Sequence, residues 1–300
     1  MLVYSPEIQT LLNTQYAEPG RYYHNINHIK FLLSKLDEWY TACKLTTQHT
    51  EKIYELTKHA IWWHDVIYSV WNAPGINEGQ SAALFSEYYE QGKIPLNIYG
   101  IDSDSAANII FLAISATSKH LVDLDLETGT DRLTDEVIKL MLDLDMSGFG
   151  KHYDLVAWNS AQVLAEYEPM GRSTDELLEG RILFLEKLLA RKRIFYTNYF
   201  YETYEAQARK NITQSIMEAK DEPNEPESMF SMHEPTISGR SYSAGIAEVV
   251  HQNRNYFLNP NSGLKGYYLR GNPYLFDGYT LYYEDGSVWA TPSLDWLVLE

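Results

Sequence analysis

A helical repeat of apolar residues runs through the N-terminal part of this chain and constrains its fold most strongly. Between residues 5 and 219, apolar side chains return every three or four positions, the spacing that gathers them on one face of an α-helix. The pattern predicts helices over residues 29–39, 51–68, 77–89, 105–118, 134–146, 153–168, 174–191 and 199–220. Short loops containing Gly, Pro or Asp separate them, which is typical of an all-α domain. We therefore expect a mainly α fold.

The pattern changes near residue 221. Residues 221–240 contain three prolines and few large apolar residues, a composition typical of a linker or an exposed loop. Beyond them, residues 266–269 and 279–283 are rich in Tyr and Leu and predict short strands, and a Glu-Asp-Gly-Ser turn after the second strand indicates a hairpin. The expected organisation is a helical domain over residues 1–220, a linker over 221–240, and a small β-containing module over 241–300.

The charge of the chain argues against nucleic acid as its partner. There are 41 acidic and 24 basic side chains, a formal net charge of -17. Duplex nucleic acid would be repelled by that field unless basic residues were locally concentrated, and the sequence has no such run. Acidity is also compatible with binding of divalent cations, although it serves solubility equally well.

Cysteine content and hydropathy predict a cytoplasmic protein. A single cysteine, Cys43, excludes an intramolecular disulfide framework and favours a reducing compartment. The N-terminal residues lack the basic and apolar regions of a signal peptide. No apolar run approaches the roughly 20 residues that a membrane span needs. An apolar helix face would still permit a homodimer.

Histidine and aspartate residues recur at three places where predicted helices begin or end. They are His24, His28, His64, Asp65, Asp143 and Asp145. If residues 23–28 are helical, both histidines of that stretch lie on one face. Imidazole and carboxylate groups together suit Mn, Fe, Co, Ni, Mg or Zn, and a carboxylate on an apolar helix is costly to bury without a cation. Each residue alone is explained as a core histidine or a helix cap, so the order and the flanking pattern decide.

That order, a His, then an adjacent His-Asp pair, then an Asp, each on its own helix, resembles the HD superfamily of metal-dependent phosphohydrolases. Further stretches resemble the family called predicted metal-dependent HD-superfamily phosphohydrolases. They are residues 19–29, 64–68, 77–82, 117–120, 143–146, 149–150, 166–167, 180–181 and 208–211. The resemblance covers about residues 5–215. Met146 stands where the family usually has Leu, and residues 221–300 lie outside the resemblance.

The resemblance implies an HD-domain helical bundle and a divalent metal site. The implied ligands are His28, His64, Asp65 and Asp145. His28 is preferred to His24 because apolar residues follow it in the family's pattern, and Asp143 remains the alternative to Asp145. Two histidines and two aspartates leave positions on an octahedral ion for water and a phosphate oxygen.

The resemblance also suggests roles around the metal. Asp65 would steer the attacking water, and Glu78 would act as general acid or base, although a helix-start role for Glu78 is equally compatible. The candidate phosphate-binding residues are His24, His120, Arg21, Arg181 and Arg209. His120 is also a candidate for a second metal, and the arginines have the alternative of pairing with glutamates.

The expected function is metal-dependent hydrolysis of a phosphoester. The substrate would be a small phosphorylated molecule, a nucleotide or a nucleotide-derived signalling molecule, and the 14% aromatic content would suit stacking on a base. Two alternatives stay open. One is a di-iron HD-type oxygenase with His24 and His120 as extra ligands, and the other is a nucleotide-sensing or partner-binding regulatory HD protein.

Overall fold

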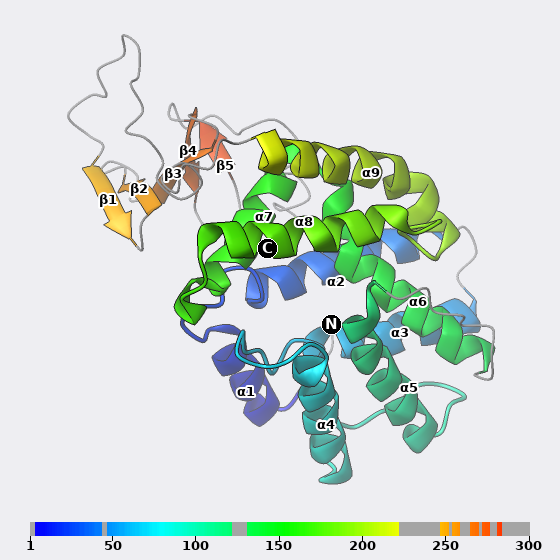
Figure 1. The fold of residues 1–300 in the computed structure, drawn as a ribbon. Helices are drawn as coiled ribbons and strands as arrows, with labels where there is room; N and C mark the ends of the chain where they lie inside the picture. Colours follow the sequence, from blue (N-terminus) through cyan, green and yellow to red (C-terminus); the bar gives the residue numbers. More distant parts are fainter. Residues whose placement is uncertain are drawn as a thin grey trace. The chain divides into compact units, whose positions relative to one another are not determined.

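The prediction of a mainly helical chain is confirmed (Figure 1). The computed structural model describes residues 4–43, 47–121 and 131–221, and beyond these only the backbones of five short strands. The α-helices are α1 (Pro6–Tyr16), α2 (Ile26–Ala42), α3 (Gln48–Trp63), α4 (Ile76–Glu90), α5 (Ser103–Ala116), α6 (Arg132–Met146), α7 (Tyr153–Glu166), α8 (Thr174–Ala190) and α9 (Asn198–Asp221). Short 3-10 turns occupy η1 (Thr117–Lys119), η2 (Ser147–Gly150) and η3 (Glu168–Met170).

Polar caps fix where several helices begin. The side chains of Ser5, Thr47 and Asp102 each accept a hydrogen bond from a backbone N–H of the first turn that follows. Asp131 does the same for two N–H groups at the start of α6. These groups have no partner inside the helix, so a side-chain oxygen placed just before it stabilises its start.

Among the helix boundaries that differ from the prediction, two lie beside the candidate ligands. Asn25 caps α2 by accepting from the backbone N–H of Asn27 at 2.8 Å, so the helix starts at Ile26 and His24 precedes it. Residues 23–25 are therefore not helical, and the condition under which His24 and His28 would share a helix face is not met. An Asn side chain that bonds to nearby backbone favours a cap over a helix interior.

Helix α3 ends at Trp63, five residues before the predicted end. The chain after it is held by side chains of α4: the hydroxyl of Ser81 bonds both the N–H and the carbonyl of Ile67. The amide of Asn77 likewise bonds the backbone of Ser69 through both of its ends. These tertiary bonds replace the helical ones, which the hydrophobic period alone does not reveal.

Helix α3 packs against α2, α5 and α6 in one hydrophobic core. Leu56, Ile61 and Trp63 of α3 are fully buried there, together with Ile110 of α5 and Leu144 of α6. Burying each such side chain contributes about 1.5–3 kcal/mol. The ends of these helices are therefore held in fixed positions, and they carry the candidate ligands. Among the helices that the structure describes, none has both the length and the apolar character of a membrane span.

The chain divides into two units, Met1–Arg172 with Gly180–Ile216, and Ser173–Glu179 with Met217–Glu300. The second unit includes strands β1 (Ala247–His251), β2 (Arg254–Leu258), β3 (Lys265–Leu269), β4 (Asn272–Phe276) and β5 (Leu281–Tyr283), each antiparallel to the next. The predicted linker over residues 221–240 and the predicted hairpin turn lie almost wholly outside the described residues. A packed β-containing module is therefore not confirmed, and the predicted domain boundaries stay a prediction.

Candidate metal centre

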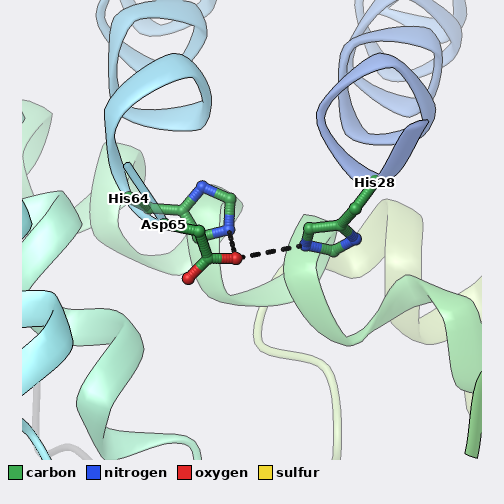
Figure 2. A group of neighbouring side chains, drawn as sticks. All are labelled: His28, His64 and Asp65. Atoms are coloured by element: carbon green, nitrogen blue, oxygen red, sulfur yellow. Dashed lines mark ion pairs between the residues drawn. The ribbon is translucent and has the colours of Figure 1, made fainter. Parts of the chain in front are cut away.

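Three helix ends bring the four candidate ligands together. His28 lies in the first turn of α2, His64 caps the C-terminus of α3, Asp65 follows it, and Asp145 lies in the last turn of α6. Figure 2 shows His28, His64 and Asp65, whose ligand atoms all lie within 4.8 Å of one another. The helical packing described above thus gathers residues that are far apart in sequence.

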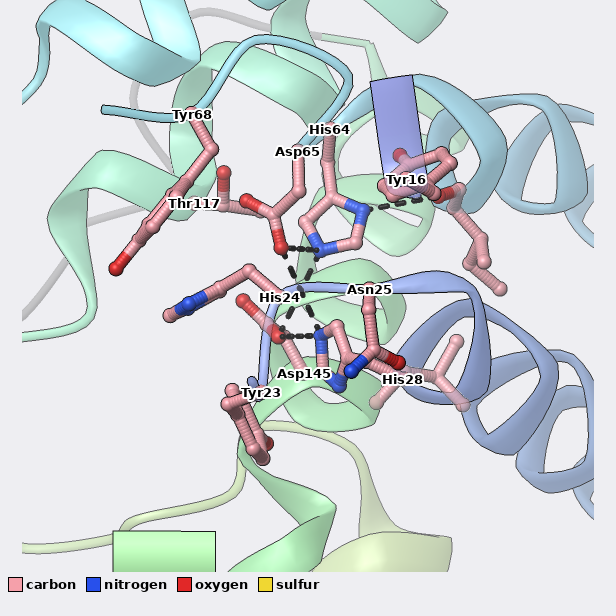
Figure 3. Close-up of polar contacts among 12 residues, drawn as sticks. Tyr16, Tyr23, His24, Asn25, His28, His64, Asp65, Tyr68, Thr117 and Asp145 are labelled. Carbon is pink, nitrogen blue, oxygen red and sulfur yellow. Dashed lines mark hydrogen bonds and ion pairs between the residues drawn. The ribbon is translucent and has the colours of Figure 1, made fainter. Parts of the chain in front are cut away.

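The nitrogen and oxygen atoms of this cluster converge closely (Figure 3). The Nε2 atom of His28 is 3.1 Å from Oδ1 of Asp145 and 3.8 Å from Oδ2 of Asp65. The Nε2 atom of His64 is 2.9 Å from Oδ2 of Asp65 and 3.8 Å from Oδ1 of Asp145. The side chains of His28 and His64 are only 2% and 1% exposed, and the two carboxylates 13% and 17%.

The tautomer of His64 follows from its second nitrogen. Its Nδ1 donates to the carbonyl of Ile61 at 2.9 Å, so the proton of the neutral ring sits on Nδ1. The lone pair on Nε2 then faces carboxylate oxygens, which also only accept. Nε2 is buried and makes no well-formed hydrogen bond despite the nearby oxygen. A cation between these atoms would satisfy all of them, and a backbone carbonyl on Nδ1 is the usual way to orient a metal-binding histidine.

The charges in the cluster favour a cation strongly. Burial alone would lower the pKa of His64, but the carboxylates of Asp65 and Asp145 raise it to about 9. Burial would raise the pKa of Asp65, and the neighbouring His64 instead holds it below its usual range. Burial opposes ionisation of Asp145 as well, yet hydrogen bonds from His120 and His28 hold its pKa well below normal. A divalent ion would take the place of these protons.

Asp143 faces away from the cluster. Its carboxylate accepts from the backbone N–H groups of Tyr196 and Thr197 and from the hydroxyl of Thr197, each at 2.7 Å. Burial nevertheless raises the pKa of Asp143 to about 7, against these hydrogen bonds. Of the two aspartates left open by the sequence, the structure places Asp145 with the histidines, while Asp143 fixes the segment before α9.

The other two histidines border the cluster in different ways. His120 follows η1, and its Nε2 is 2.8 Å from the second oxygen, Oδ2, of Asp145. Its Nδ1 is buried and has no hydrogen-bond partner. His24 stacks on Tyr68, with ring centroids 4.1 Å apart, and its Nδ1 lies 2.6 Å from Oε2 of Glu166. Burial would lower the pKa of His24, but Glu166 raises it to about 8.

Two of the predicted phosphate-binding arginines use their donors inside the protein. Arg21 donates to the carbonyls of Asp65 and Val66 and to the carboxylate of Glu18, so it holds the loop that carries the His-Asp pair. Arg209 donates to Glu205 and to three backbone carbonyls, one in the last turn of α8 and two just after it. These contacts assign both side chains to holding loops rather than to clamping a phosphate.

Arg181 differs from the other two. Its only hydrogen bond among the described residues is from Nη2 to the hydroxyl of Ser160 at 2.8 Å. The guanidinium lies over the rings of Phe149 and Phe184, and its Nε is buried without a partner. Burial lowers the pKa of Arg181 to about 10. Within the described part of the chain, this cation has no anionic partner of the kind that would normally accompany it.

Glu78 lies in the first turn of α4, where an acidic side chain complements the helix dipole. No hydrogen bond or ion pair joins it to the cluster within the described part of the chain. Its Oε2 is buried and has no hydrogen-bond partner among the described residues. The position is compatible with either predicted role for Glu78.

Glu166 is the residue of this region whose role the sequence did not reveal. It lies at the end of α7 with its side chain 0% exposed, and it accepts hydrogen bonds from Tyr23, His24 and Tyr68. The available signals were the resemblance of residues 166–167 to the HD family and a charged residue closing the apolar stretch Val163-Leu164-Ala165. The sequence does not tell which distant donors would meet it.

No family model matches this chain, and no curated protein or solved structure matches it either. Its function is therefore inferred from the side chains described above.

Proposed function

We propose that this chain is a metal-dependent phosphohydrolase of the HD type, with its ion held by His28, His64, Asp65 and Asp145. The observation that carries the proposal is the convergence of two imidazole Nε2 atoms and two carboxylates at three buried helix ends. The unpartnered Nε2 of His64 supports a cation at that point. Two nitrogen and two oxygen donors suit Mn, Fe, Co, Ni, Mg or Zn.

In this proposal, Asp65 and Arg21 have separate roles in phosphoester hydrolysis. When bound, a divalent ion supplies Lewis acidity toward a phosphoryl oxygen and lowers the pKa of water. Oδ2 of Asp65 faces both histidines, and no hydrogen bond to its other oxygen is found among the described residues. That oxygen is available to orient the attacking water. Arg21 holds the carbonyl of Asp65 and so keeps the carboxylate in place.

Arg181 is the arginine that best suits phosphate binding. Its buried guanidinium has no carboxylate partner in the described part of the chain, so an anionic substrate group would relieve an unfavourable charge. Tyr23 lies between it and the cluster. The Tyr23 ring is 4.8 Å from that of His28, and burial and the charge of Asp145 raise the pKa of Tyr23 while the charge of Arg181 lowers it. His120, on the second oxygen of Asp145, is the other candidate for contact with substrate.

We propose a nucleotide or a nucleotide-derived signalling molecule as substrate. Trp71, 66% exposed on the loop after the His-Asp pair, offers an indole face for stacking on a base. The expected cytoplasmic location, the homodimer and the lack of a duplex nucleic-acid partner remain predictions.

One further function is favoured by a specific contact. Because His120 lies 2.8 Å from the second oxygen of Asp145, these two residues would be the ones to hold a second ion. A pair of iron ions there would support oxygen-dependent chemistry instead of hydrolysis. Mössbauer spectroscopy of protein produced with iron distinguishes a coupled di-iron centre from a single ion.

The test of hydrolysis combines metal content with phosphate release. We expect the purified protein, supplied with Mn²⁺, to bind metal and to release phosphate from members of a nucleotide panel. His64→Ala and Asp65→Ala should lose both properties, while His59→Gln, a change at another buried histidine of α3, should keep them. Metal binding without phosphate release from any nucleotide would favour the nucleotide-sensing or partner-binding alternative, and a wild type that binds no supplied metal would contradict the proposal.

A further inference from the structure

Gly148, in the 3-10 turn η2 that follows α6, adjoins two polar side chains from other parts of the chain. The glycine is buried, and a Cβ atom at this position would lie 3.8 Å from the hydroxyl oxygen of Tyr23 and 3.6 Å from Nδ2 of Asn159. Within the described residues no hydrogen bond is made by that hydroxyl or by that amide. The missing side chain therefore leaves room for a small group beside two available donors.

The guanidinium of Arg181 is brought to the same place by the neighbours of these residues. Phe149 follows Gly148, and the centroid of its ring is 5.4 Å from Cζ of Arg181. Ser160 follows Asn159, and its hydroxyl accepts from Nη2 of Arg181 at 2.8 Å. Two consecutive pairs on separate elements thus hold the guanidinium beside the room left by the glycine.

Aromatic rings hold Arg181 in position without using its donors. The Phe149 and Phe184 rings lie 6.5 Å apart at an interplanar angle of 30°, and the guanidinium is 5.4 Å and 5.3 Å from their centroids. Its Nε is buried without a hydrogen-bond partner among the described residues. A guanidinium fixed in this way presents a planar set of N–H donors that matches the oxygens of a phosphate.

This group of donors is separate from the proposed metal site. No ion pair joins Arg181 to a carboxylate of the cluster in the described part of the chain. Tyr23 lies between them, with its ring 4.8 Å from that of His28 and its hydroxyl beside Gly148. A phosphate at the metal would thus be on one side of the phenol, and the guanidinium is left for another anionic group on the other side.

We propose that Tyr23, Asn159 and Arg181 bind a second anionic group of the substrate, an inference that rests on the proposed phosphohydrolase function. It narrows the substrate class to nucleotides with two separate phosphate groups, of which only the one at the metal is hydrolysed. Gly148 contributes to this specificity because it leaves room for the second phosphate. Arg181 supplies charge and paired donors, and the phenol and the amide add further hydrogen bonds.

The first test compares a nucleotide that carries two phosphates with its singly phosphorylated counterparts. With Mn²⁺-loaded protein, kcat/KM for phosphate release should be roughly 10- to 100-fold higher for adenosine 3′,5′-bisphosphate than for adenosine 3′- or 5′-monophosphate. Arg181→Met should abolish this preference, because it removes the charge. Arg132→Met is the matched control, since Arg132 is 83% exposed and pairs with Glu136, and it should leave the preference unchanged.

Two further variants test the room beside Gly148 and the phenol. Gly148→Val fills the room and should abolish the preference for the bisphosphate, while the affinity for Mn²⁺ stays within about threefold because no proposed ligand changes. Tyr23→Phe removes one hydroxyl and keeps the ring, so it should lower the preference by about 2- to 10-fold even if the valine variant does not fold. A full preference in both variants would overturn the proposed subsite.

Nitrogen NMR of the metal-free protein in chelator tests the subsite without hydrolysis. The Nε–H signal of Arg181, identified by its absence in Arg181→Met, should shift to saturation as inorganic phosphate is added. In Gly148→Val it should not shift, and the signal of the exposed Arg132 should not shift in the wild type. An Arg181 signal that phosphate does not move overturns the subsite.

The two measurements separate the failure of the subsite from that of the proposed function. A wild type that hydrolyses the nucleotides without preferring the bisphosphate, or an Arg181→Met variant that loses equal activity on all of them, overturns the second-phosphate role while the hydrolase function stands. If the wild type hydrolyses none of them, the hydrolase proposal fails for these nucleotides, and the phosphate titration alone decides whether Arg181 belongs to an anion subsite.

Discussion

Helix α3 carries two buried histidines whose surroundings lead to opposite properties. His59 and His64 are 4% and 1% exposed. Nδ1 of His59 accepts from the hydroxyl of Tyr4 at 2.7 Å, and that hydroxyl in turn accepts from the indole of Trp63 at 3.1 Å. Burial lowers the pKa of His59 to about 3, whereas the carboxylates of Asp65 and Asp145 raise that of His64 to about 9.

The difference shows that burial alone does not mark a functional histidine. His59 receives a hydrogen bond from a neutral partner and stays neutral, so its site is complete within the protein. His64, when its ring is neutral, directs the lone pair of Nε2 at carboxylates, and that atom has no hydrogen-bond partner among the described residues. Only the second site has a set of donor atoms that a cation would complete.

Substituting His64 and His59 in separate variants should produce the largest difference in metal affinity. His64→Ala removes a proposed ligand. Changes in residues that only support ligands lower metal affinity by about 10- to 100-fold, so we expect His64→Ala to lower the affinity for Mn²⁺ by more than roughly 100-fold. His59→Gln should leave Mn²⁺ affinity within about threefold, since it alters no ligand. Isothermal titration of metal into each variant measures both values, and a comparable loss in His59→Gln would remove the distinction between the two sites.

The effect of Mn²⁺ on the melting temperature should also distinguish variants at the two sites. A ligand present at about 100 times its Kd stabilises the folded state by about 2.7 kcal/mol. We expect Mn²⁺ to raise the melting temperature of the wild type and of His59→Gln to the same extent. Asp65→Asn should show no rise, because an amide in place of the carboxylate removes the charge that binds the ion. A rise in Asp65→Asn equal to that of the wild type would place the ion elsewhere.

The two aspartates of α6 extend the same comparison. Asp143 accepts three hydrogen bonds inside the protein, so Asp143→Asn should lower the free energy of unfolding by about 1–3 kcal/mol. Asp145→Asn should instead abolish metal binding. Chemical denaturation in the presence of chelator, together with metal titration, distinguishes the two effects. If Asp143→Asn also lost the metal, its role would not be confined to the fold.

The neutral state of His59 should affect how the free energy of unfolding depends on pH. The pKa of His59 is lowered from 6.5 to about 3 on folding, so the unfolded chain binds a proton that the folded protein excludes. The stabilising contribution is complete above pH 6.5 and is lost as the pH falls toward 3. Between these limits His59 should contribute about 1.4 kcal/mol per pH unit to the loss. Denaturation of metal-free wild type and His59→Gln at pH 5.5 and 4.5 measures the difference, and parallel losses would contradict it.

The sequence predicted the helices well because their apolar period reflects the core they form. It predicted the neighbourhood of the ligands less well. The start of α2 depends on the cap at Asn25, and the end of α3 depends on bonds from Ser81 and Asn77 in the next helix. Local propensity competes there with contacts that a hydrophobic pattern does not contain.

The candidate ligands could be chosen from the order of His and Asp along the chain, yet their partners could not. The choice between Asp143 and Asp145 required the positions of Tyr196 and Thr197, which lie in a distant part of the sequence. The roles of Arg21 and Arg209 required the backbone carbonyls that they meet. The sequence does not show whether an arginine beside a motif bonds to backbone carbonyls or binds an anion. Arg181 differs from Arg21 and Arg209 because, among the described residues, it bonds only to the hydroxyl of Ser160.

Anomalous diffraction from crystals of the wild-type protein with Mn²⁺ tests the central claim most directly. The account predicts a manganese peak within coordination distance of Nε2 of His28, Nε2 of His64 and the carboxylates of Asp65 and Asp145. It predicts no ion at His59. A map with no peak at the four residues under saturating Mn²⁺, or with the ion bound at another group of side chains, would contradict it.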